Sequence, residues 1–243
     1  EECKQCSSVF AFLAEANAAD SPLPNLDAGD KRSIIGGVET LIAYETKYHS
    51  VDNLVPLSDD HIEVGFAVSL GESLCGGFEI LFCGRIDAIC RDKQGLFIAD
   101  HKTTWSLAQM WQWGLNPNHQ FTGYAYGASL TLGEPIHRVM VNGIQVSGKS
   151  RNFSRPQLER TILSYENWKK MVLHRVEQMR RAVEVGYYDP AMGVSCTRYN
   201  SKCAYYDVCL APGMEEVMME DFEIQEWAPY GEPMLGAFKE MMK

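Results

Sequence analysis

Two aspartates and a lysine fall on a segment that the sequence predicts to be a β-hairpin. Asp92 and Gly95 bound a turn-like stretch and are expected to close the turn as a pair. The antiparallel register that follows places Asp87 opposite Asp100, with their β-carbons about 5 Å apart. Lys102 points to the same face as Asp100, two residues away. Two ionised carboxylates this close repel each other unless a cation or a proton lies between them.

A divalent Mg²⁺ or Mn²⁺ would satisfy this pair of carboxylates. Hard cations take oxygen ligands, and the backbone carbonyl of His101 could complete the set. Lys102 could orient an attacking water or hold a phosphate oxygen, while the metal lowers the pKa of the water. These groups are suited to phosphodiester hydrolysis. The alternative is a hairpin with two unrelated surface aspartates, one of them paired with the lysine.

The eight cysteines are distributed unevenly along the chain. Cys196, Cys203 and Cys209 fall within 14 residues, whereas Cys3 and Cys6 lie near the N-terminus. In a cytosolic setting, clustered cysteines indicate metal ligands more readily than disulfides, and zinc and iron–sulfur sites both typically use four ligands. Spacing alone does not choose between these two metals, and three unligated thiols are a further alternative.

Length, charge and hydropathy limit the class of protein. The chain has 243 residues, 46% of them hydrophobic, so disordered and fibrous classes are excluded. Its 22 lysines and arginines against 32 aspartates and glutamates give a net charge of −10, so any nucleic-acid site must be a local feature. No apolar run is long enough for a membrane span and no secretory signal is visible. We expect a soluble, cytoplasmic protein.

Hydrophobic periodicity predicts the elements that must position these residues. The expected elements, in chain order, are a helix over residues 30–49, strands over 62–70, 78–90 and 96–103, a helix over 118–132, a strand over 136–146, and a long helix from an N-cap at Ser154 to Gly186. The order is therefore helix, three strands, helix, strand, helix, which is an α/β fold.

Three segments on these elements resemble the RecB-like branch of the PD-(D/E)XK nuclease superfamily. They are Gly84-Arg-Ile-Asp87, Leu96-Phe-Ile-Ala-Asp-His-Lys-Thr-Thr104 and Gln120-Phe-Thr-Gly-Tyr124. Each segment is weak alone, but the three in order are specific, and the resemblance covers about residues 30–210. It implies a restriction-endonuclease-like αβββαβ core, in which helices flank a mixed central sheet.

The resemblance also implies a role for each matching residue. Asp87, Asp100 and the carbonyl of His101 would bind Mg²⁺ or Mn²⁺, with Lys102 as the catalytic lysine. The implied function is a metal-dependent deoxyribonuclease, an exonuclease acting on single-stranded DNA ends in recombination, repair or CRISPR spacer acquisition, in a bacterium or a phage-infected cell. The alternative is a non-catalytic DNA-end-binding or adaptor module that keeps the fold.

Two helical residues would contact the DNA. Gln120 and Tyr124 lie one turn apart on the same helix face, and the resemblance implies that they touch the DNA backbone and steady the active site. Without that resemblance, a surface amide and a packed aromatic ring would be the simpler interpretation.

One position departs from the family pattern. Relatives usually carry a metal-binding histidine in a Gly-x-x-x-His setting on the helix before the first strand. The matching segment here, Gly36-Gly-Val-Glu-Thr40, has threonine at that position. Either Glu39 or Glu63 replaces the histidine, or a water takes its place.

The cysteines resemble those of iron–sulfur nucleases in the same branch. In such proteins three C-terminal cysteines and one cysteine before the core hold a [4Fe-4S] cluster. The ligands implied here are Cys196, Cys203, Cys209 and Cys6, with Cys3 as the alternative to Cys6. A zinc ion at the same place remains the alternative, and either metal would be structural.

Four regions follow from these patterns. They are an N-terminal segment with a cluster cysteine (1–29), the nuclease core (30–186), the iron–sulfur cysteine region (187–212) and an acidic tail that could dock a partner protein (213–243). Trp105, Trp111 and Trp113 follow the hairpin, where they could stack on unpaired bases or pack into the core.

Overall fold

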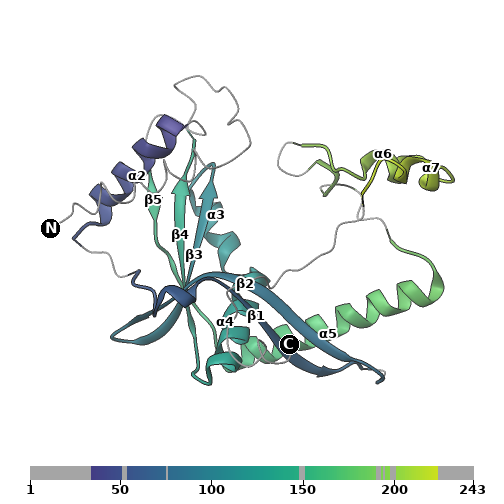
Figure 1. Ribbon diagram of the computed structural model, residues 1–243, viewed down its shortest axis with the longest axis horizontal. Helices are drawn as coiled ribbons and strands as arrows, with labels where there is room; N and C mark the ends of the chain where they lie inside the picture. The colour runs from purple at the N-terminus through teal and green to yellow at the C-terminus, as the bar shows by residue number, and fades with distance from the viewer. Residues whose placement is uncertain are drawn as a thin grey trace. The chain divides into compact units, whose positions relative to one another are not determined.

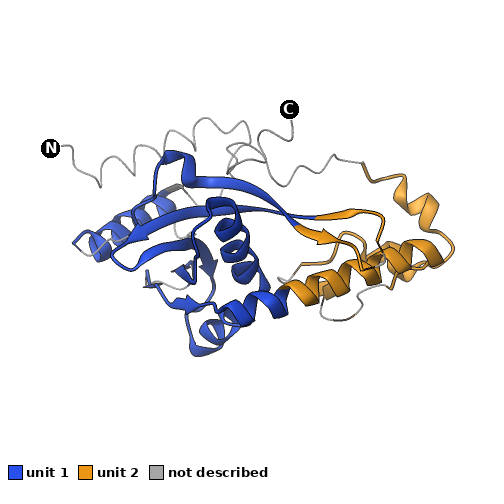
Figure 2. Cartoon of the chain, turned by 90° about the horizontal axis from the view of Figure 1, so that it is seen from below, with its two compact units in different colours: residues 1–69, 81–168, 229–243 blue, residues 70–80, 169–228 orange. Residues whose placement is uncertain are grey.

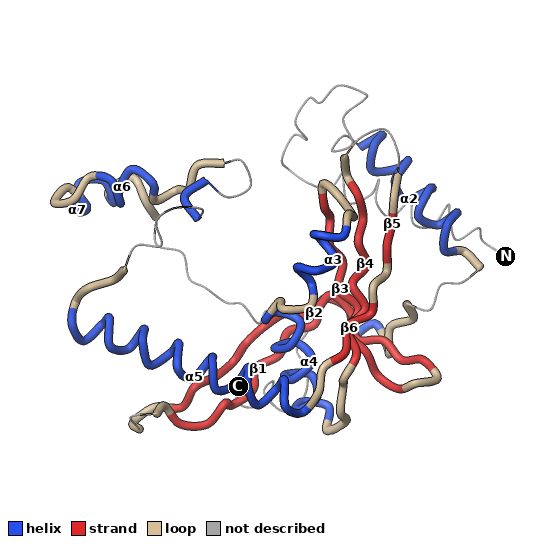
Figure 3. Tube along the Cα trace, turned by 180° about the vertical axis from the view of Figure 1, so that it is seen from behind, coloured by secondary structure: helices blue, strands red, loops and turns tan. Residues whose placement is uncertain are grey.

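A six-stranded mixed sheet organises the residues described by the computed structural model (Figure 1; Figure 3). These residues are 34–50, 54–74, 76–147, 151–189, 193, 195–197 and 201–223. The strands are β1 (Ile62–Glu72), β2 (Glu79–Asp92), β3 (Gly95–Thr104), β4 (Arg138–Gln145), β5 (Phe153–Ser154) and β6 (Gln157–Glu159). Strand order is β1-β2-β3-β4-β5, and β6 also pairs with β4. β3 and β4 are parallel, whereas the β2–β3, β4–β5 and β4–β6 pairs are antiparallel.

Helices before, between and after the strands complete the predicted order. The helices are α2 (Ile34–Tyr48), α3 (Gln109–Leu115), α4 (His119–Leu132), α5 (Ile162–Val185), α6 (Tyr206–Leu210) and α7 (Glu215–Met219), with a short 3₁₀ turn η1 (Asp59–His61). The expected α/β fold with helices flanking a mixed sheet is confirmed. α3, β5, β6, α6 and α7 were not predicted from periodicity.

Capping residues explain where α4 begins and ends. The Asn118 side chain accepts a hydrogen bond from the Gln120 amide at 2.9 Å, which satisfies one of the donors exposed at the helix start. Gly133 follows the last turn with φ +66°, a left-handed conformation that glycine adopts without a steric penalty. Both ends lie where the sequence predicts them, so the position of Gln120 and Tyr124 on the helix is well defined.

The predicted start of the long helix is wrong. Ser154 lies in β5, where it pairs with Gly143, and α5 begins only at Ile162. Thr161 and Ser164 cap the helix instead, because the amide of each residue donates to the hydroxyl of the other. The Ser154 pattern fails because pairing with β4 and burial of Phe153 stabilise this segment as an extended edge of the sheet.

The sheet has a different hydrophobic cluster on each face. The larger one joins strand residues such as Phe66 and Ile98 to Phe121 of α4 and Tyr165 of α5. The smaller one contains Ala88, Cys90, Phe97, Ala99 and Met140. α4 approaches the sheet closely, because a methyl group at Gly127 would overlap the ring of Phe66. Glycine therefore allows the contact that brings α4 onto the face that carries Asp100.

The chain divides into two compact units (Figure 2). One comprises residues 1–69, 81–168 and 229–243, and the other comprises residues 70–80 and 169–228. No helix within the described ranges is both long and apolar enough to cross a lipid bilayer.

Candidate active site

The β2–β3 hairpin has the register expected from its turn. The ladder runs from Asp92 opposite Gly95 to Ala88 opposite Ala99, which brings Asp87 and Asp100 to the next step. At that step β2 becomes irregular. Ile86 and Ile89 both pack in the larger cluster, although strict alternation over three residues would put them on opposite faces. The alternation of side chains between the two faces of the sheet therefore shifts by one residue near Asp87, as it does at a β-bulge.

The Asp87 carboxylate reaches across to β3. Its Oδ2 atom accepts a hydrogen bond from the backbone amide of His101 at 2.7 Å. A side-chain oxygen thus takes a main-chain donor of the neighbouring strand. This contact holds the Asp87 carboxylate beside the β3 backbone at Asp100, His101 and Lys102.

Asp100 is fully buried, with 0% of its surface exposed. Its Oδ2 atom lies 2.8 Å from Lys102 Nζ, and its Oδ1 atom has no hydrogen-bond partner among the described residues. Desolvation raises the pKa of the Asp100 carboxyl from 3.8 to about 6; Lys102 opposes the shift, and the nearby charge of Asp87 adds to it. Buried carboxylate oxygens are rarely left without a partner. The site therefore fits an additional cation at Asp100.

Lys102 lies at the border between this buried carboxylate and solvent. One third of its side chain is exposed, at 32%, and its Nζ atom is 5.8 Å from the centre of the Phe121 ring on α4. The ammonium group is thus held by Asp100 and by the aromatic ring, while part of the side chain stays accessible to solvent.

Gln120 and Tyr124 meet on α4 beside the same carboxylates. Gln120 Nε2 donates to Tyr124 Oη at 3.0 Å, so the expected shared helix face is present. Burial raises the pKa of the Tyr124 hydroxyl, and the charges of Asp100 and Asp87 add to the increase while Lys102 lowers it. The structure therefore brings Asp87, Asp100, Lys102 and Tyr124 into one electrostatic environment.

A buried polar network supports the opposite side of β3. Asn142 is fully buried in β4, and its amide donates at 2.8 Å both to His101 Nδ1 and to Tyr44 Oη of α2. Arg155 Nε donates to Asn142 Oδ1 at 3.3 Å, and its guanidinium lies 3.6 Å over the ring of Tyr48. Because the Asn142 amide donates, His101 Nδ1 accepts. Sequence reasoning missed this network, although an asparagine inside a buried apolar strand was a signal for it.

We expect Asn142→Leu to lower the free energy of unfolding by about 2–4 kcal/mol, because it removes the buried amide that hydrogen-bonds to His101, Tyr44 and Arg155. Chemical denaturation measures the change. Asn152→Leu is the matched control: Asn152 is exposed and its side-chain amide donates to Gln145 at the surface, so its loss should cost less than about 0.5 kcal/mol. Equal stability of the two variants would show that the network does not stabilise β3.

Thr40 and Glu39 of α2, at and beside the position of the missing histidine, both make contacts other than with Asp87 and Asp100. The Thr40 hydroxyl donates to the Gly36 carbonyl of its own helix at 2.7 Å. Glu39 forms an ion pair with Arg151, at 2.5 Å between Oε2 and Nη2. Of the two acidic replacements that the sequence leaves open, Glu39 is thus engaged elsewhere.

Glu63, the other replacement, lies beside Asp87. It lines a cavity of about 350 Å³ together with Asp87, His101 and Tyr44. Its backbone has φ +49°, the only positive value at a non-glycine residue in the described ranges, and Arg85 donates to its carbonyl at 2.6 Å. Residues other than glycine, asparagine and aspartate rarely adopt this backbone conformation, and such backbone strain often accompanies functional sites.

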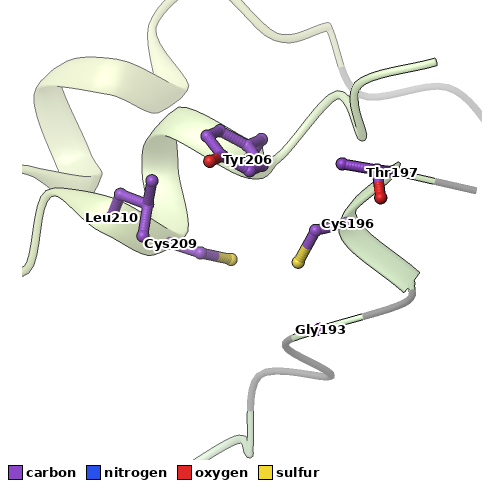
Figure 4. A pocket seen from close by; sticks show the side chains of 6 residues that line it. All are labelled: Gly193, Cys196, Thr197, Tyr206, Cys209 and Leu210. Atoms are coloured by element: carbon purple, nitrogen blue, oxygen red, sulfur yellow. The ribbon is translucent and has the colours of Figure 1, made fainter. Parts of the chain in front are cut away.

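The three C-terminal cysteines lie close in sequence, and two of them, Cys196 and Cys209, line one pocket. Figure 4 shows the sulfur atoms of Cys196 and Cys209 directed into the space between their two segments, where the structure has a pocket of about 300 Å³. The Cys203 amide donates to the Cys196 carbonyl at 2.9 Å. The expected N-terminal ligands, Cys6 and Cys3, lie outside the described residues.

No group of three or more histidine, cysteine, aspartate or glutamate side chains that could hold a metal ion occurs within the described parts of the chain. At the hairpin, the protein offers two carboxylates, so backbone carbonyls and water would have to complete a metal's coordination. In the C-terminal cysteine segment, the thiols of Cys196 and Cys209 line the same pocket.

Comparison with known proteins places the chain in a family. The solved structures that resemble the chain include two of low identity, each with a TM-score of 0.41. One is a protein named SSO0001 (15% identity, 86% of this chain, 81% of that chain), and the other is a protein from Eubacterium rectale described as a "putative exonuclease" (14% identity, 94% and 78%). No curated protein matches the chain. The family model of the PD-(D/E)XK nuclease superfamily matches residues 8–210. The chain therefore belongs to the PD-(D/E)XK nuclease superfamily.

Proposed function

We propose that this protein is a metal-dependent deoxyribonuclease that degrades DNA from single-stranded ends. The observation that carries the proposal is the buried Asp100 carboxylate, whose Oδ1 atom has no described hydrogen-bond partner and whose neighbours are Asp87 and Lys102. Membership of a nuclease superfamily supports a hydrolase that acts on nucleic acid. Recombination, repair or spacer acquisition in a bacterial or phage-infected cell would be the setting.

Asp87 and Asp100 would hold a Mg²⁺ or Mn²⁺ ion, with the His101 carbonyl as a further ligand. The donor set fits a hard cation, because it consists of oxygen atoms and one of them is buried without a partner. When bound, such an ion supplies positive charge for the phosphate and lowers the pKa of water. The Asp87 carboxylate keeps its position through the His101 amide.

Lys102 would act on the reacting phosphate directly. Its ion pair with Asp100 fixes the position of Nζ, while its exposed fraction leaves the ammonium accessible to a phosphate oxygen or to the attacking water. Charge that develops in the transition state is stabilised best by groups that are already in place. Gln120 and Tyr124 would contact the phosphate next to the one that is cleaved.

Glu63 is the acidic residue that we propose in place of the missing histidine. It shares a cavity with Asp87 and His101, whereas Glu39 is paired with Arg151. The positive φ of Glu63 represents a local cost that a purely structural glutamate would not need.

A [4Fe-4S] cluster held by Cys196, Cys203, Cys209 and Cys6 is the second part of the proposal, with zinc as the alternative metal. Two of these thiols face one pocket. In addition, none of the described residues from 193 to 223 is buried. α6 and α7 have five residues each, too short to be stable as isolated helices. A segment with so little core needs another source of stability, and a metal site can provide it.

The test is degradation of end-labelled single-stranded DNA by anaerobically purified protein, with Mg²⁺, Mn²⁺ or EDTA. Lys102→Ala should reduce cleavage by at least about a hundredfold, because it removes preorganised charge at the phosphate. Lys93→Ala is the matched control, since Lys93 is an exposed lysine in the turn of the same hairpin. Cleavage that survives EDTA or Lys102→Ala would contradict the proposed site.

A DNA-binding adaptor without activity is the second candidate function. The observation in its favour is Thr40 at the position where relatives have a metal-binding histidine, with its hydroxyl engaged in its own helix. DNA binding by the wild type without any metal-dependent cleavage would identify the protein as such an adaptor.

A further inference from the structure

We propose that Trp105 and the outer face of α3 form a stacking platform for the bases of an unpaired DNA strand on its way to Lys102. The platform is defined by Trp105, Met110 and Trp113. The proposal rests on the proposed nuclease function, because it names the part of the substrate that the site recognises. Stacking would add affinity that does not depend on the net charge, which is −10 for this chain.

The inner face of α3 places the helix beside the catalytic strand. A methyl group at Gly143 would lie 2.8 Å from Leu107 Cδ2 and would overlap the Trp111 ring, so both side chains lie directly over this glycine. Gly143 is the partner of Lys102 in the parallel β3–β4 ladder. Paired residues of neighbouring strands share a face of the sheet. α3 therefore lies next to Lys102 on the face that carries Asp100.

The outer face of α3 is apolar and open to solvent. Met110 and Trp113 are three residues apart, which puts them on one side of the helix. Their exposed fractions are 73% and 60%, and that of Trp105 is 78%. Trp111, by contrast, is half-buried against the core. Of the two roles that the sequence leaves open for these tryptophans, core packing applies to Trp111. Trp105 and Trp113 belong to neither hydrophobic cluster of the described residues.

The backbone around Trp105 is fixed although its ring is exposed. The Ser147 hydroxyl donates to the Trp105 carbonyl, and the Val146 amide donates to the Thr104 carbonyl at 2.9 Å. Trp105 follows Lys102 by three residues, a reach of about 10 Å in extended chain, or one to two nucleotides. β3 ends at Thr104, so strand alternation no longer fixes the side toward which the Trp105 ring is directed; we place a base on that ring and its phosphate at the proposed catalytic lysine.

The charge distribution along the sequence suits this occupant. Residues 103–118 contain no charged side chain, and the charged or titratable residues that flank the stretch are Lys102 and His119. Phosphates would meet no carboxylate from this segment, although the chain as a whole is acidic. Stacking on aromatic rings accepts every base and requires bases whose faces are not covered by a complementary strand. We therefore commit to an unpaired strand rather than a duplex.

DNA binding and cleavage can be measured separately. Equilibrium affinity is measured in EDTA, where the proposed reaction cannot proceed, with a labelled 20-nucleotide oligothymidine and with a blunt duplex. Trp105→Ala and Trp113→Ala should each weaken single-strand binding about tenfold, with duplex binding changed less than about twofold, and the phenylalanine variants should retain most of the affinity. Tyr187→Ala is the matched control, because Tyr187 is an aromatic residue of similar exposure (62%) outside the platform.

The outcomes separate the platform from the nuclease activity. If the wild type cleaves DNA and the tryptophan variants bind and cleave as it does, the platform is wrong while the nuclease proposal stands. If the wild type does not cleave, the nuclease proposal fails, and the ratio of single-strand affinities still decides on the platform. Equal losses for single-stranded and duplex DNA, or a dimer in solution that the substitutions dissociate, would also overturn the platform.

Discussion

Asp100→Asn is expected to abolish metal-dependent cleavage and, at the same time, to stabilise the protein without metal. The loss of cleavage should reach about a thousandfold or more, because the neutral amide removes the charge at the proposed metal site and the ion pair that positions Lys102. The asparagine side chain has nearly the same shape, so the fold itself should accept it.

The gain in stability follows from the raised pKa of Asp100. Burial moves this pKa from 3.8 to about 6, so the folded state keeps a proton that the unfolded state releases between these pH values. The free energy of unfolding therefore falls as the pH rises from about 4 to 6, and the loss persists above pH 6. A shift of this size corresponds to about 3 kcal/mol. Asparagine avoids that cost.

Denaturation in EDTA at several pH values measures this effect. Asp100→Asn should be more stable than the wild type by up to about 3 kcal/mol at pH 7.5, with the difference shrinking below pH 6. Asp92→Asn is the contrasting control. The Arg138 guanidinium donates to both Asp92 oxygens and lowers the pKa of that carboxyl, so its neutralisation should destabilise the fold near neutral pH. Lower stability of Asp100→Asn at every pH would contradict the burial argument.

Cys196→Ser is expected to remove iron and to loosen the C-terminal segment before it alters the chemistry at the hairpin. The described residues from 193 to 223 include no buried side chain, so loss of a metal ligand leaves little to hold this segment. Loss of a structural metal commonly costs about 4 kcal/mol or more. Cleavage should fall only as far as the folded fraction falls.

Metal analysis and limited proteolysis test this second prediction. Wild-type protein purified without oxygen should contain about four iron atoms and four sulfides per chain, and protease should cut the segment much faster in Cys196→Ser. Cys83→Ser is the matched control, because Cys83 is a half-buried cysteine in β2 that does not line the C-terminal pocket. One zinc per chain in the wild type would identify zinc, the alternative metal, instead of the cluster. Wild-type protein that contains neither metal would refute the metal site.

Local patterns determine the parts of the fold that the sequence predicts correctly. The hairpin register depends on a turn between Asp92 and Gly95 and on alternation over a few residues. The bounds of α4 depend on Asn118 and Gly133, which act on the backbone beside them. The same local reasoning failed at Ser154, where pairing with a strand that is distant in sequence outweighed a favourable cap.

The parts of the site that sequence reasoning missed depend on distant residues. Asn142 meets Tyr44 of α2 across 98 positions and His101 across 41 positions of the chain. No periodicity connects such residues, because their contact exists only once α2 and the sheet have packed together. Likewise, the division of Trp105, Trp111 and Trp113 into exposed and half-buried rings follows from how α3 lies over Gly143.

The hydrogen bond between Asp87 and the His101 amide also affects how the site responds to thermal motion. Sheets twist and their strands slide by small amounts, and a site assembled from two strands would distort with each fluctuation. Here the Asp87 carboxylate is attached to the same residue whose carbonyl we propose as a ligand. When β3 moves, both groups follow it, so their separation should vary less than the separation of the two strands.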